Sequence, residues 1–129
     1  MGEIKGLHHV AYKVIPEHFQ KIIDFYRDFL GLNVVRQGST CIMLDLGNTI
    51  LEIVQENGKT TDRYGCLDHI ALLVNEEDVD KLCKKVSDAG YEVTMSPNNI
   101  VIDSTPPYPA RICFFTGPCG EYVELFAER

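Results

Sequence analysis

The stretch GLHHVAYKV (residues 6–14) returns sixty residues later as CLDHIALLV (residues 66–74). In each copy a histidine precedes an apolar residue, an alanine and further, mainly apolar positions. Short runs rich in apolar and β-branched residues are typical of β-strands. A strand that a chain repeats in this way indicates an internal duplication, so the segments that follow the two copies should match as well.

The segments after the two strands do have the same order. In the first half, Pro16 suits the first turn of a helix, apolar residues then recur at helical spacing, and Gly31 stands where such a helix would end. In the second half, an amphipathic helix ends at Gly90. Three strands are predicted after each helix, at residues 33–37, 40–46 and 49–55 in the first half and at residues 91–95, 110–116 and 121–127 in the second.

Each half is therefore predicted to be a βαβββ module, which makes the chain an α+β protein. The sequence indicates a single domain over residues 1–129, with module one at about 5–57, a polar linker at about 58–65 and module two at about 66–129. The second module is about 12 residues longer than the first. Its prolines favour a loop, SPNNIVIDSTPPYP (96–109), as the place of the extra residues.

Strand alternation places two histidines and two glutamates on matching faces of the two modules. His9 and His69 hold the same position in the repeated strand, whose opposite face is apolar and is expected to receive the helix. Glu52 in LEI and Glu124 in VEL also hold matching positions. A carboxylate with apolar neighbours on its own face is expected to be partly buried and to have a partner. Two imidazoles and two carboxylates suit a first-row divalent metal ion.

A structural role is the alternative for each of these residues taken singly. A lone histidine in a strand is more often a hydrogen-bonded structural residue, and a lone glutamate usually faces solvent. The recurrence of the pair in both halves favours the metal. Of the other histidines, His8 lies on the opposite face of its strand from His9 and aligns with Asp68, and His18 is expected at the surface of the first helix.

Composition limits the classes of partner. The chain has 129 residues and a formal net charge of −7, which argues against a nucleic-acid surface because phosphate binding needs an excess of Lys and Arg. No apolar run approaches the roughly 20 residues that span a bilayer, and MGEIKGLHHV lacks the apolar core of a signal peptide, so a cytoplasmic protein is expected. The five cysteines form no C-x-x-C pair and are expected to be free thiols.

On these residues the chain resembles the vicinal oxygen chelate superfamily and, within it, glyoxalase I (lactoylglutathione lyase). The strands HHVAYKV and DHIALLV and the segment FFTGPCGEYVELF (114–126) carry the resemblance. It implies the glyoxalase/bleomycin resistance/dioxygenase fold, in which two βαβββ modules form a cupped mixed β-sheet. It also implies one divalent metal per site, with nickel or cobalt favoured and zinc as the alternative. The ligands implied by the resemblance are His9, Glu52, His69 and Glu124.

The resemblance further implies a lyase or isomerase. The metal would stabilise an enediolate formed when a base removes a proton from a hemithioacetal or a related α-oxygenated carbonyl compound. Glu124 is the first candidate for this base and Glu52 is the second. The candidate substrate-binding residues are two cations and two aromatic residues: Lys13, Arg111, Tyr122 and Phe126.

Two positions depart from the pattern of glutathione-dependent members. Those members tend to have arginine four residues after the first ligand, where this chain has Lys13, and asparagine four residues after the second, where it has Glu56. No lysine follows Lys85. An anionic tripeptide adduct is therefore expected to be a poor substrate.

Other members of the superfamily give alternative functions. A methylmalonyl-CoA epimerase-like enzyme would use the same proton abstraction, although that family usually has glutamine where Glu52 stands. A small-molecule or drug-binding protein generally lacks the metal ligands. Ring-cleaving dioxygenases and fosfomycin-modifying relatives use three metal-ligating residues. The fourth candidate ligand in this chain argues against both functions. The expected partners are a small-molecule substrate, such as a thiol adduct, and a second copy of the chain, because the short linker favours a homodimer whose metal sites are built from both chains.

Overall fold

The computed structural model of the chain describes residues 2–57 and 66–129, which fall into two compact units. The first-module unit consists of His9–Asp68 and Asp103–Pro106. The second-module unit consists of Met1–His8, His69–Ile102 and Pro107–Arg129. Each unit thus includes one short segment from the other half of the sequence. The predicted linker at 58–65 lies outside the described residues.

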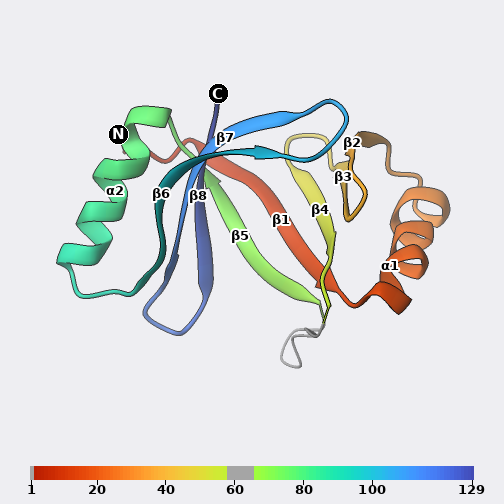
Figure 1. Cartoon of the computed structure of the whole chain (residues 1–129), viewed down its shortest axis with the longest axis horizontal. Helices are drawn as coiled ribbons and strands as arrows, with labels where there is room; N and C mark the ends of the chain where they lie inside the picture. The colour runs from red at the N-terminus through yellow and green to blue at the C-terminus, as the bar shows by residue number, and fades with distance from the viewer. Residues whose placement is uncertain (1, 58–65) are drawn as a thin grey trace. The chain divides into compact units, whose positions relative to one another are not determined.

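The first-module unit is a mixed sheet with one α-helix (Figure 1). Its strands are ordered β2-β3-β4-β1, where β1 and β4 are parallel and the other neighbours are antiparallel. The elements are β1 (Gly6–Val14), α1 (Pro16–Ile23), the π-helical turn η1 (Asp24–Phe29), β2 (Val34–Gln37), β3 (Cys41–Asp45) and β4 (Ile50–Gln55).

The second-module unit has the same plan. Its strands are ordered β5-β8-β7-β6, where β5 and β8 are parallel and β7 is antiparallel to both of its neighbours. The elements are β5 (Leu67–Leu73), α2 (Glu76–Asp88), β6 (Val93–Ile102), β7 (Tyr108–Thr116) and β8 (Tyr122–Glu128). Each half of the sequence therefore gives one βαβββ module, and the predicted α+β fold class is confirmed.

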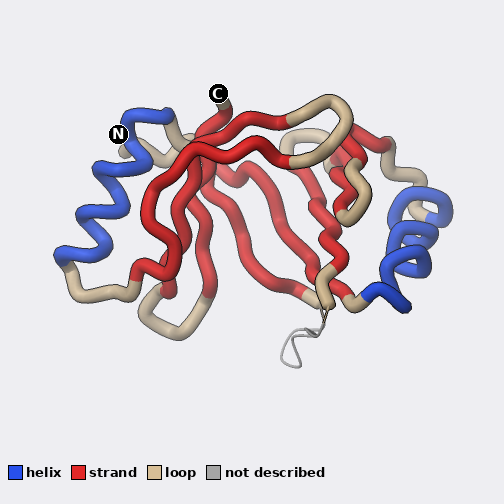
Figure 2. The backbone as a smooth tube through the Cα atoms, viewed as in Figure 1, coloured by secondary structure: helices blue, strands red, loops and turns tan. Residues whose placement is uncertain are grey.

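In each unit, one face of the sheet packs against the unit's own helix (Figure 2). Fully burying one aliphatic side chain in a core of this kind stabilises the fold by about 1.5–3 kcal/mol. The opposite face of β1 and of β5 is left for the histidines. The core residues of the first-module unit are Val14, Ile23, Ile42, Leu44, Leu51 and Ile53, and those of the second-module unit are Val74, Val79, Cys83, Cys113, Leu125 and Ala127.

The prediction of a loop over residues 96–109 is wrong. Strand β6 continues to Ile102 and β7 begins at Tyr108, so only a short connection separates them. The inference from proline content failed because Pro97 lies in β6, an edge strand that pairs only with β7. A proline is tolerated at such an edge, where its missing N–H removes no bond, and the pairing also shifts register between Met95 and Asn98.

Other local predictions are confirmed. The GN dipeptide at 47–48, which is typical of a hairpin turn, joins β3 to β4, and Gly47 has a φ of 100°, a conformation that glycine adopts without a steric penalty. Gly31, at a φ of 81°, follows the end of η1 as predicted for a helix end. Within residues 2–57 and 66–129, no helix has the length and apolar character that a membrane crossing would need.

The connection between β6 and β7 belongs to the first-module unit because it adds to the sheet edge there. Thr105 and Gln37 exchange two backbone hydrogen bonds, of 2.8 and 3.3 Å. Gly38 follows directly, and a Cβ at that position would collide with the carbonyl oxygen of Asp103. The close approach of these two backbone segments therefore requires glycine.

We expect Gly38→Ala to lower the free energy of unfolding by about 1–3 kcal/mol, because the new methyl group meets backbone that cannot move without breaking this contact. Urea denaturation followed by circular dichroism measures the loss. Gly117→Ala is the matched control, since the atoms nearest to a Cβ there belong to the flexible side chain of Glu121. An equal or smaller loss in Gly38→Ala than in the control would contradict the argument.

Candidate functional site

A buried histidine–glutamate pair lies on two parallel strands of the first-module unit. His9 of β1 and Glu52 of β4 are 2% and 8% exposed. The Nε2 atom of His9 is 3.5 Å from Oε1 of Glu52. The strands are in register so that Glu52 faces Ala11, two residues after the histidine.

The second-module unit repeats this pair in the same register. His69 of β5 and Glu124 of β8 are 7% and 4% exposed, and His69 Nε2 is 3.1 Å from Glu124 Oε1. Glu124 faces Ala71, again two residues after the histidine. The sequence prediction that each histidine shares a sheet face with a glutamate is confirmed within each unit.

These pairs have the chemistry of metal ligands. A buried carboxylate is costly without a partner, and a buried ion pair seldom stabilises a fold more than apolar residues of the same volume would. Imidazole nitrogen and carboxylate oxygen are ligands that suit divalent first-row metals. His9, Glu52 and His69 are buried residues of the kinds that could hold such an ion.

Aromatic rings surround the histidine of the second-module unit. Phe114 of β7 and Tyr122 of β8 meet the ring of His69 edge to face, with ring centroids at 5.0 and 6.0 Å. The two aromatic rings stack on each other at 4.9 Å, and the Tyr122 hydroxyl accepts a hydrogen bond from Thr94. Tyr122, a predicted substrate-binding residue, therefore lies beside His69.

Phe126, the other predicted aromatic contact, follows Glu124 by two residues on β8 and shares its face. Its side chain is fully buried and stacks on the ring of His8 at 4.0 Å. It also contacts Tyr108, at a centroid distance of 5.4 Å. Phe126 thus packs against His8 and Tyr108 on the Glu124 face of β8, and its role in substrate binding stays a prediction.

Lys13, the predicted cation of the first-module unit, is held by two carboxylates. Its Nζ lies 3.1 Å from Glu56 Oε2 and 3.6 Å from Asp68 Oδ2. Burial alone lowers the pKa of Lys13, but the hydrogen bond to Glu56 and the charges of both carboxylates outweigh it, so the pKa lies above its ordinary value. Lys13 lies on the same face of β1 as His9. Its positive charge is already balanced there by the two carboxylates.

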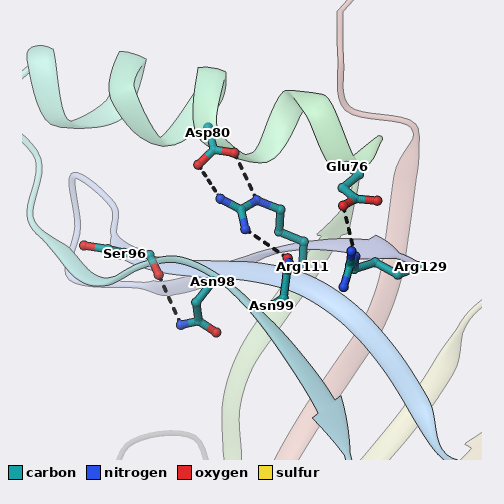
Figure 3. A network of polar contacts seen from close by, with 7 residues as sticks. All are labelled: Glu76, Asp80, Ser96, Asn98, Asn99, Arg111 and Arg129. Carbon is teal, nitrogen blue, oxygen red and sulfur yellow. Dashed lines mark hydrogen bonds and ion pairs between the residues drawn. The ribbon is translucent and has the colours of Figure 1, made fainter.

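Arg111, the predicted cation of the second-module unit, is engaged on the α2 side of β7 (Figure 3). Its guanidinium donates to both carboxylate oxygens of Asp80, at 2.7 and 3.0 Å, and to Asn99 at 2.9 Å. The hydrogen bond from Arg111 lowers the pKa of Asp80. Strand alternation puts Arg111 on the opposite face from Phe114, so the structure does not bring it to His69 and Glu124.

Sequence reasoning missed Phe114 beside His69 and also missed Tyr108. The alternation of ARICFFT held the signal for Phe114, because this residue pairs with Glu124 in the β7–β8 register. Three of the five cysteines lie in surroundings that disfavour the reactive thiolate form. Burial raises the pKa of Cys41 and Cys66, and burial together with the neighbouring Cys83 raises that of Cys113 to about 12.

Comparison with known proteins gives one family. The family model described as Glyoxalase/Bleomycin resistance protein/Dioxygenase superfamily matches residues 6–125. Metallothiol transferase FosB of Staphylococcus epidermidis is 32% identical over 79 residues. That alignment covers 60% of this chain and 55% of FosB, so the matched part is about half of the relative's length.

Solved structures share the fold at low identity. Methylmalonyl-CoA epimerase from Mycobacterium tuberculosis superposes with a TM-score of 0.71 at 18% identity, covering 100% of this chain and 91% of the epimerase. The Mn(II)-bound glyoxalase from Novosphingobium aromaticivorans gives a TM-score of 0.72 at 21% identity, covering 100% of this chain and 42% of that one. At such identities the likeness concerns the fold alone.

Proposed function

Because the chain belongs to the Glyoxalase/Bleomycin resistance protein/Dioxygenase superfamily, we propose that it is a metal-dependent enzyme acting on a small molecule. The observation that carries the proposal is the recurrence of one buried His–Glu pair, in one register, in both units. In this proposal one divalent metal takes its ligands from both pairs, His9 with Glu52 and His69 with Glu124. Nickel or cobalt is favoured and zinc is the alternative.

The residues fit such an ion because of what they offer together. Two imidazole nitrogens and two carboxylate oxygens leave coordination positions for a substrate. When bound, the metal supplies Lewis acidity that polarises a carbonyl oxygen. A binding protein without a metal would gain nothing from four buried polar ligands, which favours the enzyme over the small-molecule or drug-binding alternative.

The proton transfer falls to one of the glutamates. We propose that Glu124 removes the proton next to the carbonyl group of a hemithioacetal or a related α-oxygenated substrate, with Glu52 as the second candidate. Glu124 is 4% exposed and pairs in register with Phe114. The rings of Phe114 and Tyr122 beside His69 limit the access of water, which would otherwise compete for the abstracted proton.

Thiol transfer is the second candidate reaction. The similarity to metallothiol transferase FosB favours it, since the 32% identity over the 79 aligned residues is higher than the 18% and 21% of the two solved structures. We place both candidate reactions at the same metal site. A substrate panel separates them: methylglyoxal with several thiols, methylmalonyl-CoA, and a thiol with an electrophilic acceptor such as an epoxide.

We expect each of His9→Ala, Glu52→Ala, His69→Ala and Glu124→Ala to weaken metal binding by at least the roughly 10–100-fold that loss of even an outer partner causes. The measurement is metal content by mass spectrometry after reconstitution with nickel, cobalt, zinc or manganese. His18→Ala is the control, because His18 is exposed on α1. Full occupancy in His69→Ala would refute the ligand set.

The same four ligands can come from one chain or from two, and the predicted homodimer has shared sites. Co-expression of a His9→Ala chain with a Glu124→Ala chain distinguishes these arrangements. Heterodimers retain some intact sites if each site uses both chains. They retain none if each site lies within one chain.

We expect Glu124→Gln to keep the metal and to lose activity by about 10²–10⁴-fold, the usual contribution of a general base. Glutamine keeps a carbonyl oxygen for the metal but cannot accept the proton. Glu52→Gln should be less severe. Steady-state turnover and metal content, measured on the same preparations, separate the two effects. Equal losses of turnover in both variants would contradict the assignment of Glu124 as the base.

We expect the glutathione hemithioacetal to show a high KM, because Lys13 is already neutralised by Glu56 and Asp68. Lys13→Arg combined with Glu56→Asn should lower that KM by about tenfold, the scale of one charge-assisted hydrogen bond. Lys13→Arg alone is the control and should gain less, since Glu56 then still competes for the cation. No gain in the double variant, together with good turnover of a substrate without thiol, would mean that the reaction is a different one.

A further inference from the structure

A hydrogen-bonded chain of three side chains runs through the second-module unit apart from the His–Glu pair. His8 and Tyr108 are 7% and 4% exposed, while Glu128 lies at the surface. The Nε2 atom of His8 is 2.6 Å from the Tyr108 hydroxyl oxygen. That hydroxyl donates to Glu128 Oε2, also at 2.6 Å. Both distances are short, as expected for bonds that end on a charged acceptor.

The direction of these bonds fixes the state of the His8 ring. A tyrosine hydroxyl has one proton, and in this chain it goes to Glu128. The hydroxyl oxygen must therefore accept from His8, so Nε2 of His8 carries a proton. The ring is also held from its face, where it stacks on Phe126 at 4.0 Å with an interplanar angle of 22°. His8 is thus fixed in both position and orientation.

This anchor matters because two histidines are consecutive. A slip of one residue along a strand exchanges the side chains of its two faces. In β1 such a slip would put His8 in the place of His9, and the two rings are chemically the same. The sequence prefers His9 only through the repeat, in which His9 aligns with His69 and His8 aligns with Asp68. The hydrogen bond of His8 to Tyr108 and its stacking on Phe126 support the same choice, since a His8 held by these partners cannot take the place of His9.

We propose that Tyr108 and Glu128 are positioning residues for the metal site, acting through His8 to hold the backbone that presents His9. In this role they act through His8 and are not ligands themselves. The inference rests on the proposed function, because it takes His9 to be a metal ligand. It adds that the register of β1, and with it the position of His9, is held by Tyr108, which lies one hundred residues after His8 in the sequence.

The test uses the full chain and Co²⁺ alone as the probe. Affinity is measured by competition with a chelator, and ligand geometry is followed by the visible absorption of the bound ion. Tyr108→Phe keeps the ring and removes the hydroxyl, and it should weaken Co²⁺ binding by about 10–100-fold, as loss of an outer-shell partner does. Glu128→Ala removes only the exposed end of the chain and should give a smaller loss of the same sign.

Two further variants separate positioning from general stability. Val79→Ala opens a cavity in the core under α2 and should lower the melting temperature with little change in Co²⁺ affinity. His8→Gln keeps an N–H close to the Nε2 position, so it should bind Co²⁺ nearly as well as the wild type. His8→Leu cannot donate to Tyr108 and should be as weak as Tyr108→Phe.

The outcomes are distinct. Tyr108→Phe binding no more weakly than Val79→Ala would overturn the proposal, and so would equal affinities of His8→Gln and His8→Leu. A wild-type chain that binds no metal would overturn the proposed function itself, and this inference with it. Loss of affinity in Tyr108→Phe and His8→Leu, with rescue in His8→Gln, is the expected result.

Discussion

A carboxylate buried in the middle of a β-strand is the constraint on which each half of this structure depends. Such a group needs a partner at close range, and here a parallel neighbouring strand supplies an imidazole with a two-residue offset. Parallel neighbours cannot be joined by a tight turn and need a crossover connection. The helix and the hairpin of each module provide that crossover, so the βαβββ order and the buried pair require each other.

The two modules repeat the pair but surround it differently. In the first-module unit, the nearby polar group is a lysine shared by two carboxylates, which leaves a charged, half-buried setting. In the second-module unit, His69 meets two stacked aromatic rings. A duplicated sheet thus gives two buried His–Glu pairs with different neighbours, charged in one half and aromatic in the other.

The sequence predicted what depends on strand periodicity. The pairing of His9 with Glu52 and of His69 with Glu124 follows from alternation, because a two-residue period holds along a whole strand. The helix after Pro16 was also predicted, but its change to π-helical geometry over Asp24–Phe29 was not. Both helix types give similar apolar spacing over so few residues.

What depends on distant contacts could not be predicted. Pro97 indicates a loop unless β6 is known to be an edge strand. The order of strands in a sheet cannot be predicted from local sequence pattern. Arg111 was expected near a substrate because it is one of few cations in its module, yet Asp80 of α2 faces it. The bond between His8 and Tyr108 joins residues with no periodic relation, so only the folded chain reveals it.

The proline in β6 also has a consequence for how copies of the chain avoid one another. β6 is an edge strand of ten residues, and a strand from another molecule can pair with such an edge and begin a sheet-like aggregate. Pro97 has no N–H with which to bond a strand of another molecule. The register shift beside it also bends β6 away from a flat pairing geometry. Pro97, which made β6 look like a loop in the sequence, therefore helps to prevent edge-to-edge pairing of β6 with other chains at high concentration.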